Sequence, residues 1–183
     1  IFQDPQSALN PRRMVESLLT QAMETDHRKH DAEERNQRAQ NLLREIGLPG
    51  DSRRRYPSQL SGGQRQRVNI GRAICVAPKV LVADEIVSGL DVSVQAQILN
   101  LLLRLREELD ISLLLISHDL SVVRYICSRV FVMHKGSVVE SGPTEKVFAD
   151  PQHDYTRTLL AAVPPDDANA PWPPKFNENR LLA

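Results

Sequence analysis

Residues 80–119 read VLVADEIVSGLDVSVQAQILNLLLRLREELDISLLLISHD, and this stretch decides the fold class. It contains two short apolar runs, at residues 80–83 and 112–116, of the length of buried strands. Between them, apolar side chains recur at helical spacing and predict a helix that begins near Asp91. Those side chains are Val94, Ile98, Leu101, Leu102, Leu105 and Leu109. A strand, a helix of this length and a second strand form a crossover unit, which predicts a parallel pair. Uninterrupted apolar runs further predict strands buried on both faces.

Upstream of this unit the pattern is helical. Pro11 is expected to open a helix that reaches about Glu24, because proline is tolerated in a first helical turn. Asp31 and Glu34 are spaced as a capping box, and the helix that they begin is expected to stop at Gly47. A third helix is predicted from Ser61 to Ala77, where Pro78 closes it.

The rest of the chain completes the division into segments. Downstream, RVFVMHKG (residues 129–136) is a third expected strand. We therefore expect a loop region at 1–10, a helical part at 11–77, an α/β part at 78–163, and a proline-rich tail at 164–183. The composition of this tail favours an extended or disordered segment.

Composition narrows the possible partners. Lys plus Arg and Asp plus Glu both count 23 among 183 residues, so the formal net charge is zero. A neutral chain lacks the positive field that holds nucleic acid, and we expect no nucleic-acid partner. No apolar run approaches the ~18 residues of a membrane-spanning helix, and no signal peptide is visible. Cys75 and Cys127 lie in apolar segments without metal-ligand spacing, which favours two buried thiols.

The segment LSGGQRQR (residues 60–67) leads into a predicted helix. Gly62 and Gly63 would let a ligand approach the backbone, and the free N–H groups of a helix start attract anions. Ser61 can cap the helix and also donate its hydroxyl to a phosphate oxygen. A bare Ser-Gly-Gly triplet is more often a plain cap, so the interpretation as an anion site depends on the longer string, including Gln64.

Asp84 and Glu85 end the apolar run VLVADE (residues 80–85). Ligands of open α/β sheets gather at the carboxyl ends of strands. Successive strand residues point to opposite faces, so these two carboxylates can share a site only where the strand gives way to a loop. Two acidic residues that merely solvate a strand end are the alternative.

LSGGQ followed by VLVADE resembles the signature and Walker B motifs of ABC-type ATPases, and further segments match that family in order. Gln3 resembles the Q-loop glutamine that reaches Mg²⁺ and the attacking water. The segment at 88–91 resembles the D-loop, although Asp91 can also cap the following helix. His118, directly after an apolar strand, resembles the switch histidine that contacts the γ-phosphate.

The resemblance extends to about Pro165 and implies a fold, a chemistry and a set of ligands. The fold is α/β: a partial RecA-like P-loop NTPase core, with a parallel sheet and helices, plus an α-helical ABC subdomain. ATP and Mg²⁺ are the implied cofactors. By this resemblance, Asp84 and Gln3 would serve the metal, Glu85 would activate the attacking water, and His118 would contact the γ-phosphate. Ser61, Gly62, Gly63, Gln64 and Asp91 would contact a nucleotide across a dimer of ATPase subunits.

The chain departs from the family pattern in two places. Residues 86–89 read Ile-Val-Ser-Gly where many relatives have Pro-Thr-Ser-Ala, which leaves the carboxylates intact. In addition, the sequence contains no G-x-x-x-x-G-K-[ST] string and no Gly-Lys pair, so the Walker A loop that cradles phosphates is missing. We therefore expect the chain to be part of a longer subunit.

Three stretches resemble the dipeptide and oligopeptide importer branch, which also includes nickel and glutathione importers. They are FQDPQSALNPRRMV, DVSVQAQILNLL and PQHDYTRTLLAAVP, where Asp154 replaces the proline of the usual PQHPYT. The absence of cysteine after Cys127 predicts that the iron–sulfur centre of some relatives is not formed. Transmembrane permease subunits and a second ATPase subunit are the implied partners, with the protein peripheral on the cytoplasmic face of the cell membrane. A non-catalytic interaction module and a non-transport ABC ATPase remain the alternatives.

The polypeptide of residues 1–183 should show no ATPase activity and very weak ATP binding. Its own sequence supplies no lysine and backbone cradle for the β- and γ-phosphates. Phosphate release by the purified chain is the measurement, and Glu85→Gln is the control for contaminating activity. Hydrolysis that Glu85→Gln abolishes would contradict this expectation.

Overall fold

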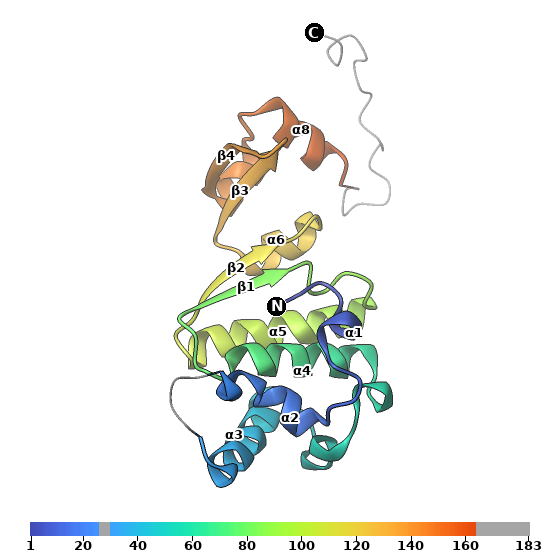
Figure 1. The fold of residues 1–183 in the computed structure, drawn as a ribbon. Helices are drawn as coiled ribbons and strands as arrows, with labels where there is room; N and C mark the ends of the chain where they lie inside the picture. Colours follow the sequence, from blue (N-terminus) through green and yellow to red (C-terminus); the bar gives the residue numbers. More distant parts are fainter. Residues whose placement is uncertain (26–29, 164–183) are drawn as a thin grey trace. The chain divides into compact units, whose positions relative to one another are not determined.

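The computed structural model describes residues 1–25 and 30–163 (Figure 1). The predicted tail at 164–183 lies outside the described residues. The chain divides into two compact units, Ile1–Ile116 and a second unit from Ser117 onward. The division follows the second strand, so the helical part and the first two strands belong to one unit.

The first unit carries seven of its described elements before the first strand and three from that strand on. They are α1 (Pro5–Ala8), α2 (Val15–Leu19), η1 (Gln21–Glu24), α3 (Ala32–Glu45), η2 (Gly50–Arg54), η3 (Pro57–Gln59), α4 (Gly62–Ile74), β1 (Val80–Asp84), α5 (Val92–Glu108) and β2 (Ser112–Ile116). β1 and β2 are parallel, with Val82 opposite Leu114 and Asp84 opposite Ile116. The predicted crossover unit is confirmed.

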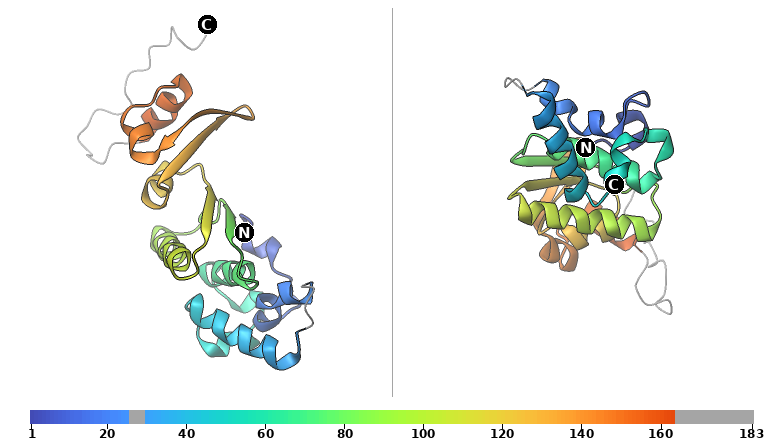
Figure 2. Two further views of the ribbon diagram at one scale, coloured as in Figure 1. Left: turned by 90° about the vertical axis from the view of Figure 1, so that its left-hand side faces the viewer. Right: turned by 90° about the horizontal axis from the view of Figure 1, so that it is seen from below.

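Helices α4 and α5 lie on the same side of the two strands (Figures 1 and 2). Leu81 and Ala83 of β1 are buried, whereas the alternate side chains of β1 are exposed. Along α5 the buried side chains recur at helical spacing, as the sequence predicts. They are Ile98, Leu99, Leu101, Leu102 and Leu105. The core of this unit is therefore the layer between the strands and the two long helices, extended by α2 and α3 behind α4.

Local signals set several helix boundaries correctly, with two exceptions. Asp31 and Glu34 form the predicted capping box. α3 ends at Glu45, and Gly47, just after its C-cap Ile46, has the positive φ of +66° that is typical of a glycine after a helix. The helix expected from Ser61 to Ala77 ends already at Ile74, with Cys75 as its C-cap. The helix expected from Pro11 begins only at Val15. The side chain of Asn10 accepts the backbone N–H of Arg12 (3.0 Å), which makes residues 10–13 a turn instead.

Gly71 allows α4 to pack closely against Leu19 of α2 and against Ile46, which follows α3. A Cβ atom at this position would lie 2.6 Å from Leu19 and 3.0 Å from Ile46. Arg38 joins α3 to α4, because its guanidinium donates to the carbonyl oxygens of Ile74 (2.9 Å) and Cys75 (3.0 Å). These carbonyls belong to the end of α4, where a helix leaves acceptors without partners.

Between Ser117 and Val163, the described part of the second unit contains a hairpin and three helices. Its elements are α6 (Leu120–Ile126), β3 (Arg129–His134), β4 (Ser137–Pro143), α7 (Thr144–Ala149) and α8 (Asp154–Ala161). β3 and β4 are antiparallel, and Lys135 and Gly136, both with positive φ, form the turn. The sequence analysis predicted β3 and missed β4, although a two-residue turn that contains glycine is a hairpin signal.

Burial corrects one prediction about the strands. The apolar runs predicted burial on both faces, but Val80, Val82, Leu114 and Ile116 are between 44% and 59% exposed. They alternate with the side chains that point to the helices, so one apolar face of the β1–β2 pair is open in the described residues. Cys75 is buried as expected, whereas Cys127 is only partly buried.

Within residues 1–25 and 30–163, none of the helices has the length and apolar character needed to cross a bilayer.

The polypeptide of residues 1–183 should self-associate through this open apolar face. Replacing Val82 and Leu114, which pair across the strands, by threonine keeps β propensity and removes exposed apolar area, so the double variant should associate less. Val92→Thr, at an exposed position on α5, is the matched control and should behave like the unchanged chain. Light scattering over a concentration series measures the effect. A monodisperse monomer with a sharp two-state melt for the unchanged chain would contradict it.

Candidate functional site

Gln3 and Glu85 are joined by a hydrogen bond although they lie far apart in the sequence. The side-chain amide of Gln3 donates to Oε2 of Glu85 at 2.6 Å. The backbone of Ile1 runs beside β1, since Asp84 donates its N–H to the Ile1 carbonyl (3.1 Å) and the Ile1 nitrogen donates to the Val82 carbonyl (2.6 Å). One residue bonded to two alternate residues of its neighbour is the pattern of a parallel ladder. This pairing delivers Gln3 to the carboxyl end of β1.

Glu85 occupies the turn that ends β1. Its backbone has φ of +45°, an uncommon conformation for a residue other than glycine. Its N–H donates to the carbonyl of Ile116 (2.9 Å), so the pairing with β2 continues one residue past Asp84. Its carbonyl accepts the N–H of Ser88 (3.0 Å), which closes the turn. Left-handed backbone at a ligand-accessible turn is typical of functional sites, where the surroundings hold a strained residue in place.

Asp84 is exposed and Glu85 is half-buried. The strand ends between them, which meets the condition that both carboxylates can serve one site. Gln3 and Glu85 are therefore brought together, with Asp84 next to Glu85 in the chain, and the roles predicted for the three residues stay predictions.

α4 begins with the cap that the sequence predicted. The hydroxyl of Ser61 accepts the N–H of Gln64 (3.3 Å), and the Gln64 side chain accepts the N–H of Ser61 (3.0 Å). This capping box accounts for Ser61 and Gln64 without a ligand. The N–H groups of Gly62 and Gly63, in the first turn, have no partner within the helix by its geometry, and such groups favour an anion.

The two glycines also have a packing role that the sequence analysis missed. A Cβ atom on Gly63 would lie 2.6 Å from Cγ1 of Val94 on α5, and one on Gly62 would lie 3.6 Å from Leu90. Close approach between α4 and the start of α5 thus requires a glycine at 63. Nothing in the local sequence indicates this, because Val94 lies 31 positions downstream.

Asp91 caps α5, which was one of its two predicted roles. Its Oδ1 accepts the hydroxyl of Ser93 (2.7 Å) and the N–H of Val94 (2.9 Å). These hydrogen bonds, that from Ser93 first, hold the pKa of the Asp91 carboxyl below its usual range. A further residue that sequence reasoning missed is Gln95, whose side-chain amide donates to the Val87 carbonyl (3.1 Å) and ties the loop after Glu85 to α5.

His118 belongs to the second unit, where it is exposed between the end of β2 and α6. Ser117 accepts the N–H of Asp119 (3.0 Å), and Asp119 caps α6 through the N–H groups of Ser121 and Val122. These contacts shape the turn that carries His118. Its role beside Glu85 stays a prediction.

The side chains of Gln3, Asp84 and Glu85, which we call the first site, offer oxygen ligands that suit a hard cation. In the described part of the chain, no group of three or more His, Cys, Asp or Glu side chains could hold a metal. Mg²⁺, however, commonly keeps several waters and takes only one or two carboxylates from the protein. Exposed Asp84, with the amide of Gln3 close to the adjacent Glu85, fits that pattern.

Comparisons with known proteins agree with these features. Residues 1–88 match the family model described as ABC transporter. Residues 139–181 match the model described as oligopeptide/dipeptide transporter, C-terminal region.

Individual relatives and solved structures give the same result. The oligopeptide transport ATP-binding protein AmiF of Streptococcus pneumoniae is 47% identical over 167 residues, which cover 91% of this chain and 54% of AmiF. The chain thus spans about half the length of the curated relatives it matches. Among solved structures, CbiO1 from Clostridium perfringens, part of the transporter complex CbiONQ, superposes with a TM-score of 0.72 at 32% identity, over 82% of this chain and 58% of that one. The dimeric ATP-binding cassette MJ0796, bound to ADP and phosphate, superposes with a TM-score of 0.66 at 29% identity, over 79% and 61%.

The packing of Gly63 generates a stability prediction. Gly63→Ala should lower the free energy of unfolding by about 1–2 kcal/mol, because the overpacking against Val94 outweighs the helix propensity that alanine adds. In a Val94→Ala background, Gly63→Ala should lower the free energy of unfolding by less, because the Cγ1 atom that it would meet is gone. Gly50→Ala, at a glycine with open space around it, is the matched control. Denaturant unfolding of the four variants measures the coupling, and equal costs of Gly63→Ala in both backgrounds would contradict the packing role.

Proposed function

The chain belongs to the ATP-binding proteins of the ABC transporter family, in the oligopeptide and dipeptide branch, and from this premise we propose that it acts in the ATPase subunit of a peptide importer. The observation that carries the proposal is the Gln3–Glu85 hydrogen bond at the carboxyl end of β1, next to Asp84. This bond brings together the segment that resembles the Q-loop and the segment that resembles Walker B, both of which the resemblance assigns to ATP hydrolysis.

In this proposal, the metal, the attacking water and the γ-phosphate are each served by named groups of the chain. Bound Mg²⁺·ATP supplies the phosphoanhydride bond and the metal charge that stabilises the transferred phosphoryl group. Asp84, exposed at the end of the strand, would hold the metal, partly through water, and the carboxamide of Gln3 would complete that shell. Glu85 would orient and deprotonate the attacking water. The amide of Gln3, which now donates to Glu85, would keep that carboxylate aimed at the site. His118 would contact the γ-phosphate.

The groups at the start of α4 would serve a second nucleotide. Ser61, Gly62, Gly63 and Gln64 surround a helix N-terminus whose N–H groups can bind phosphate. We assign them to the nucleotide held by a second ATPase subunit, with Asp91 at the contact between the two subunits. The similarity to MJ0796, whose structure is dimeric, supports this assignment.

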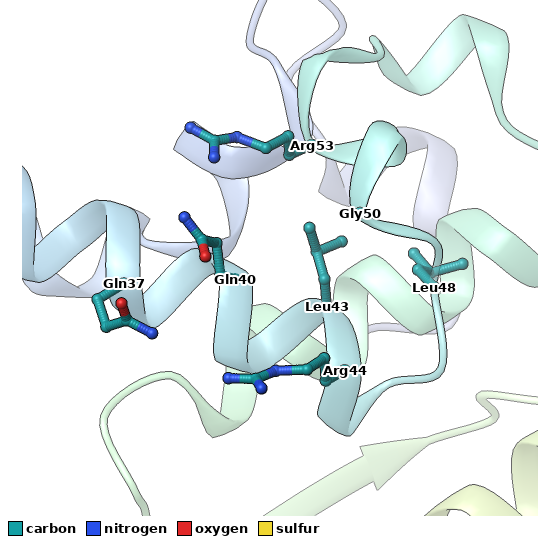
Figure 3. A pocket seen from close by; sticks show the side chains of 7 residues that line it. All are labelled: Gln37, Gln40, Leu43, Arg44, Leu48, Gly50 and Arg53. Carbon is teal, nitrogen blue, oxygen red and sulfur yellow. The ribbon is translucent and has the colours of Figure 1, made fainter.

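The helical part offers a surface for a permease subunit. A hollow of about 530 Å³ lies beside α3. Gln37, Gln40, Leu43 and Arg44 on α3 line it together with Leu48, Gly50 and Arg53 from the segment that follows (Figure 3). Its mixture of apolar and hydrogen-bonding side chains suits a short polypeptide segment. The protein would then sit on the cytoplasmic face of the membrane, bound to the permease.

The roles of the two carboxylates can be separated in the complete ATPase subunit. Glu85→Gln should remove the water-activating group and lower the rate of hydrolysis on the order of 10²–10⁴-fold. Because the metal and phosphate ligands stay, ATP binding should survive and the ATP-bound dimer should accumulate. Asp84→Asn should instead weaken the metal site itself and bind Mg²⁺·ATP poorly. Gel filtration with Mg²⁺·ATP measures dimer formation.

A signature variant provides the internal control. Ser61→Arg should leave ATP binding by the single subunit intact and block dimer formation, because Ser61 serves the opposite nucleotide. Failure of Glu85→Gln to trap a dimer, or loss of ATP binding by the isolated Ser61 variant, would overturn the assignment of roles. A wild-type subunit that binds ATP and never hydrolyses it would favour the non-catalytic interaction module.

A further inference from the structure

Two side chains of α4 hold the segment that carries Gln3. The side-chain amide of Asn69 donates to the carbonyl oxygen of Phe2 at 3.2 Å. The guanidinium of Arg72 donates to the carbonyl oxygen of Ala8 and, at 3.0 Å, to Oδ1 of Asn69. Asn69 is fully buried. The three hydrogen bonds form one connected network between α4 and the backbone before α1, at Phe2, and at the end of α1, at Ala8.

The position of the first bond matters because Phe2 directly precedes Gln3. Fixing the Phe2 carbonyl fixes the peptide plane that leads into Gln3. The cap residue Ser61 lies at the start of α4, about 12 Å from Asn69 along the helix at 1.5 Å rise per residue. The helix capped by Ser61 therefore contacts, through Asn69, the residue immediately before Gln3.

Apolar packing alone does not hold this segment in place. The side chain of Phe2 is 67% exposed, and Gln3 and Asp4 are exposed as well. Only Leu9, at the far end of the segment, is fully buried. The hydrogen bond from Asn69 on α4, the pairing of Ile1 beside β1 and the bond from Gln3 to Glu85 are thus the contacts that hold residues 2 and 3.

From this arrangement we infer that Asn69 and Arg72 are positioning residues that hold Gln3 against Glu85 and couple its position to that of α4. The inference rests on the proposed function, since it concerns the same site. Asn69 donates to the carbonyl before Gln3, and Arg72 orients Asn69 and anchors the end of the segment at Ala8.

Hydrogen exchange tests the anchoring without relying on activity. In the complete subunit, Asn69→Ala should speed backbone exchange in peptides that cover residues 2–9 and leave peptides from α3, β1 and α5 unchanged. Val92→Ala, at an exposed position on α5, is the matched control and should change neither set. If Asn69→Ala destabilises the fold, Asn69→Asp keeps the acceptor for Arg72, loses the donor to Phe2, and should give the same local pattern. Unchanged exchange in residues 2–9, or a uniform increase throughout, would overturn the inference.

Kinetics then test the coupling to Gln3. Asn69→Ala should lower kcat for ATP hydrolysis about tenfold, as expected for the loss of one hydrogen bond that positions a reacting group, with KM for ATP nearly unchanged. In a Gln3→Ala background, Asn69→Ala should have no further effect, because the group that it positions is gone. Additive losses would refute the positioning role. A wild-type subunit without any ATPase activity would instead refute the proposed function, and the exchange experiment would still decide whether Asn69 anchors the segment.

Discussion

The parallel pairing of β1 determines where every group of the first site lies. On one edge, Glu85 extends the ladder to β2 by donating to Ile116. On the other edge, Ile1 pairs with Val82 and Asp84. Because parallel strands bring their carboxyl ends to one side of a sheet, Gln3, Asp84 and Glu85 must converge there. A change in register would separate the amide from the carboxylate, whatever the side chains are.

α4 is the second organising element, and its demands explain several residues at once. Its start needs Ser61 for capping and Gly63 for close contact with Val94. Its middle needs Gly71 to pack against the helical part and Asn69 to hold the segment before Gln3. Sequence features that resemble a ligand site thus have structural reasons as well. A glycine in this helix can serve packing and phosphate binding together.

The sequence predicted features that depend on neighbouring residues better than those that depend on distant ones. The capping box at Asp31 and the cap at Ser61 follow from neighbouring residues, and the end of β1 at Asp84 follows from a local change of polarity. An apolar run could not show that only one face of β1 is buried, since the burial of each face depends on which other segments pack against it. The contact of Gly63 with Val94 was likewise hidden, because only the packing of α4 on α5 brings them together. Most of the candidate site was predictable because its residues end strands or begin helices.

The central claim is that one chain supplies the water-activating end of one ATP site and the signature end of another. The most direct test is a crystal structure of the complete subunit with Mg²⁺ and a non-hydrolysable ATP analogue. The account predicts Gln3, Asp84 and Glu85 around the metal and γ-phosphate of one nucleotide, with Ser61 of the same chain on the phosphates of the nucleotide bound by the other subunit. A structure in which Ser61 contacts the nucleotide of its own subunit, or in which Gln3 and Glu85 lie away from any nucleotide, would contradict it.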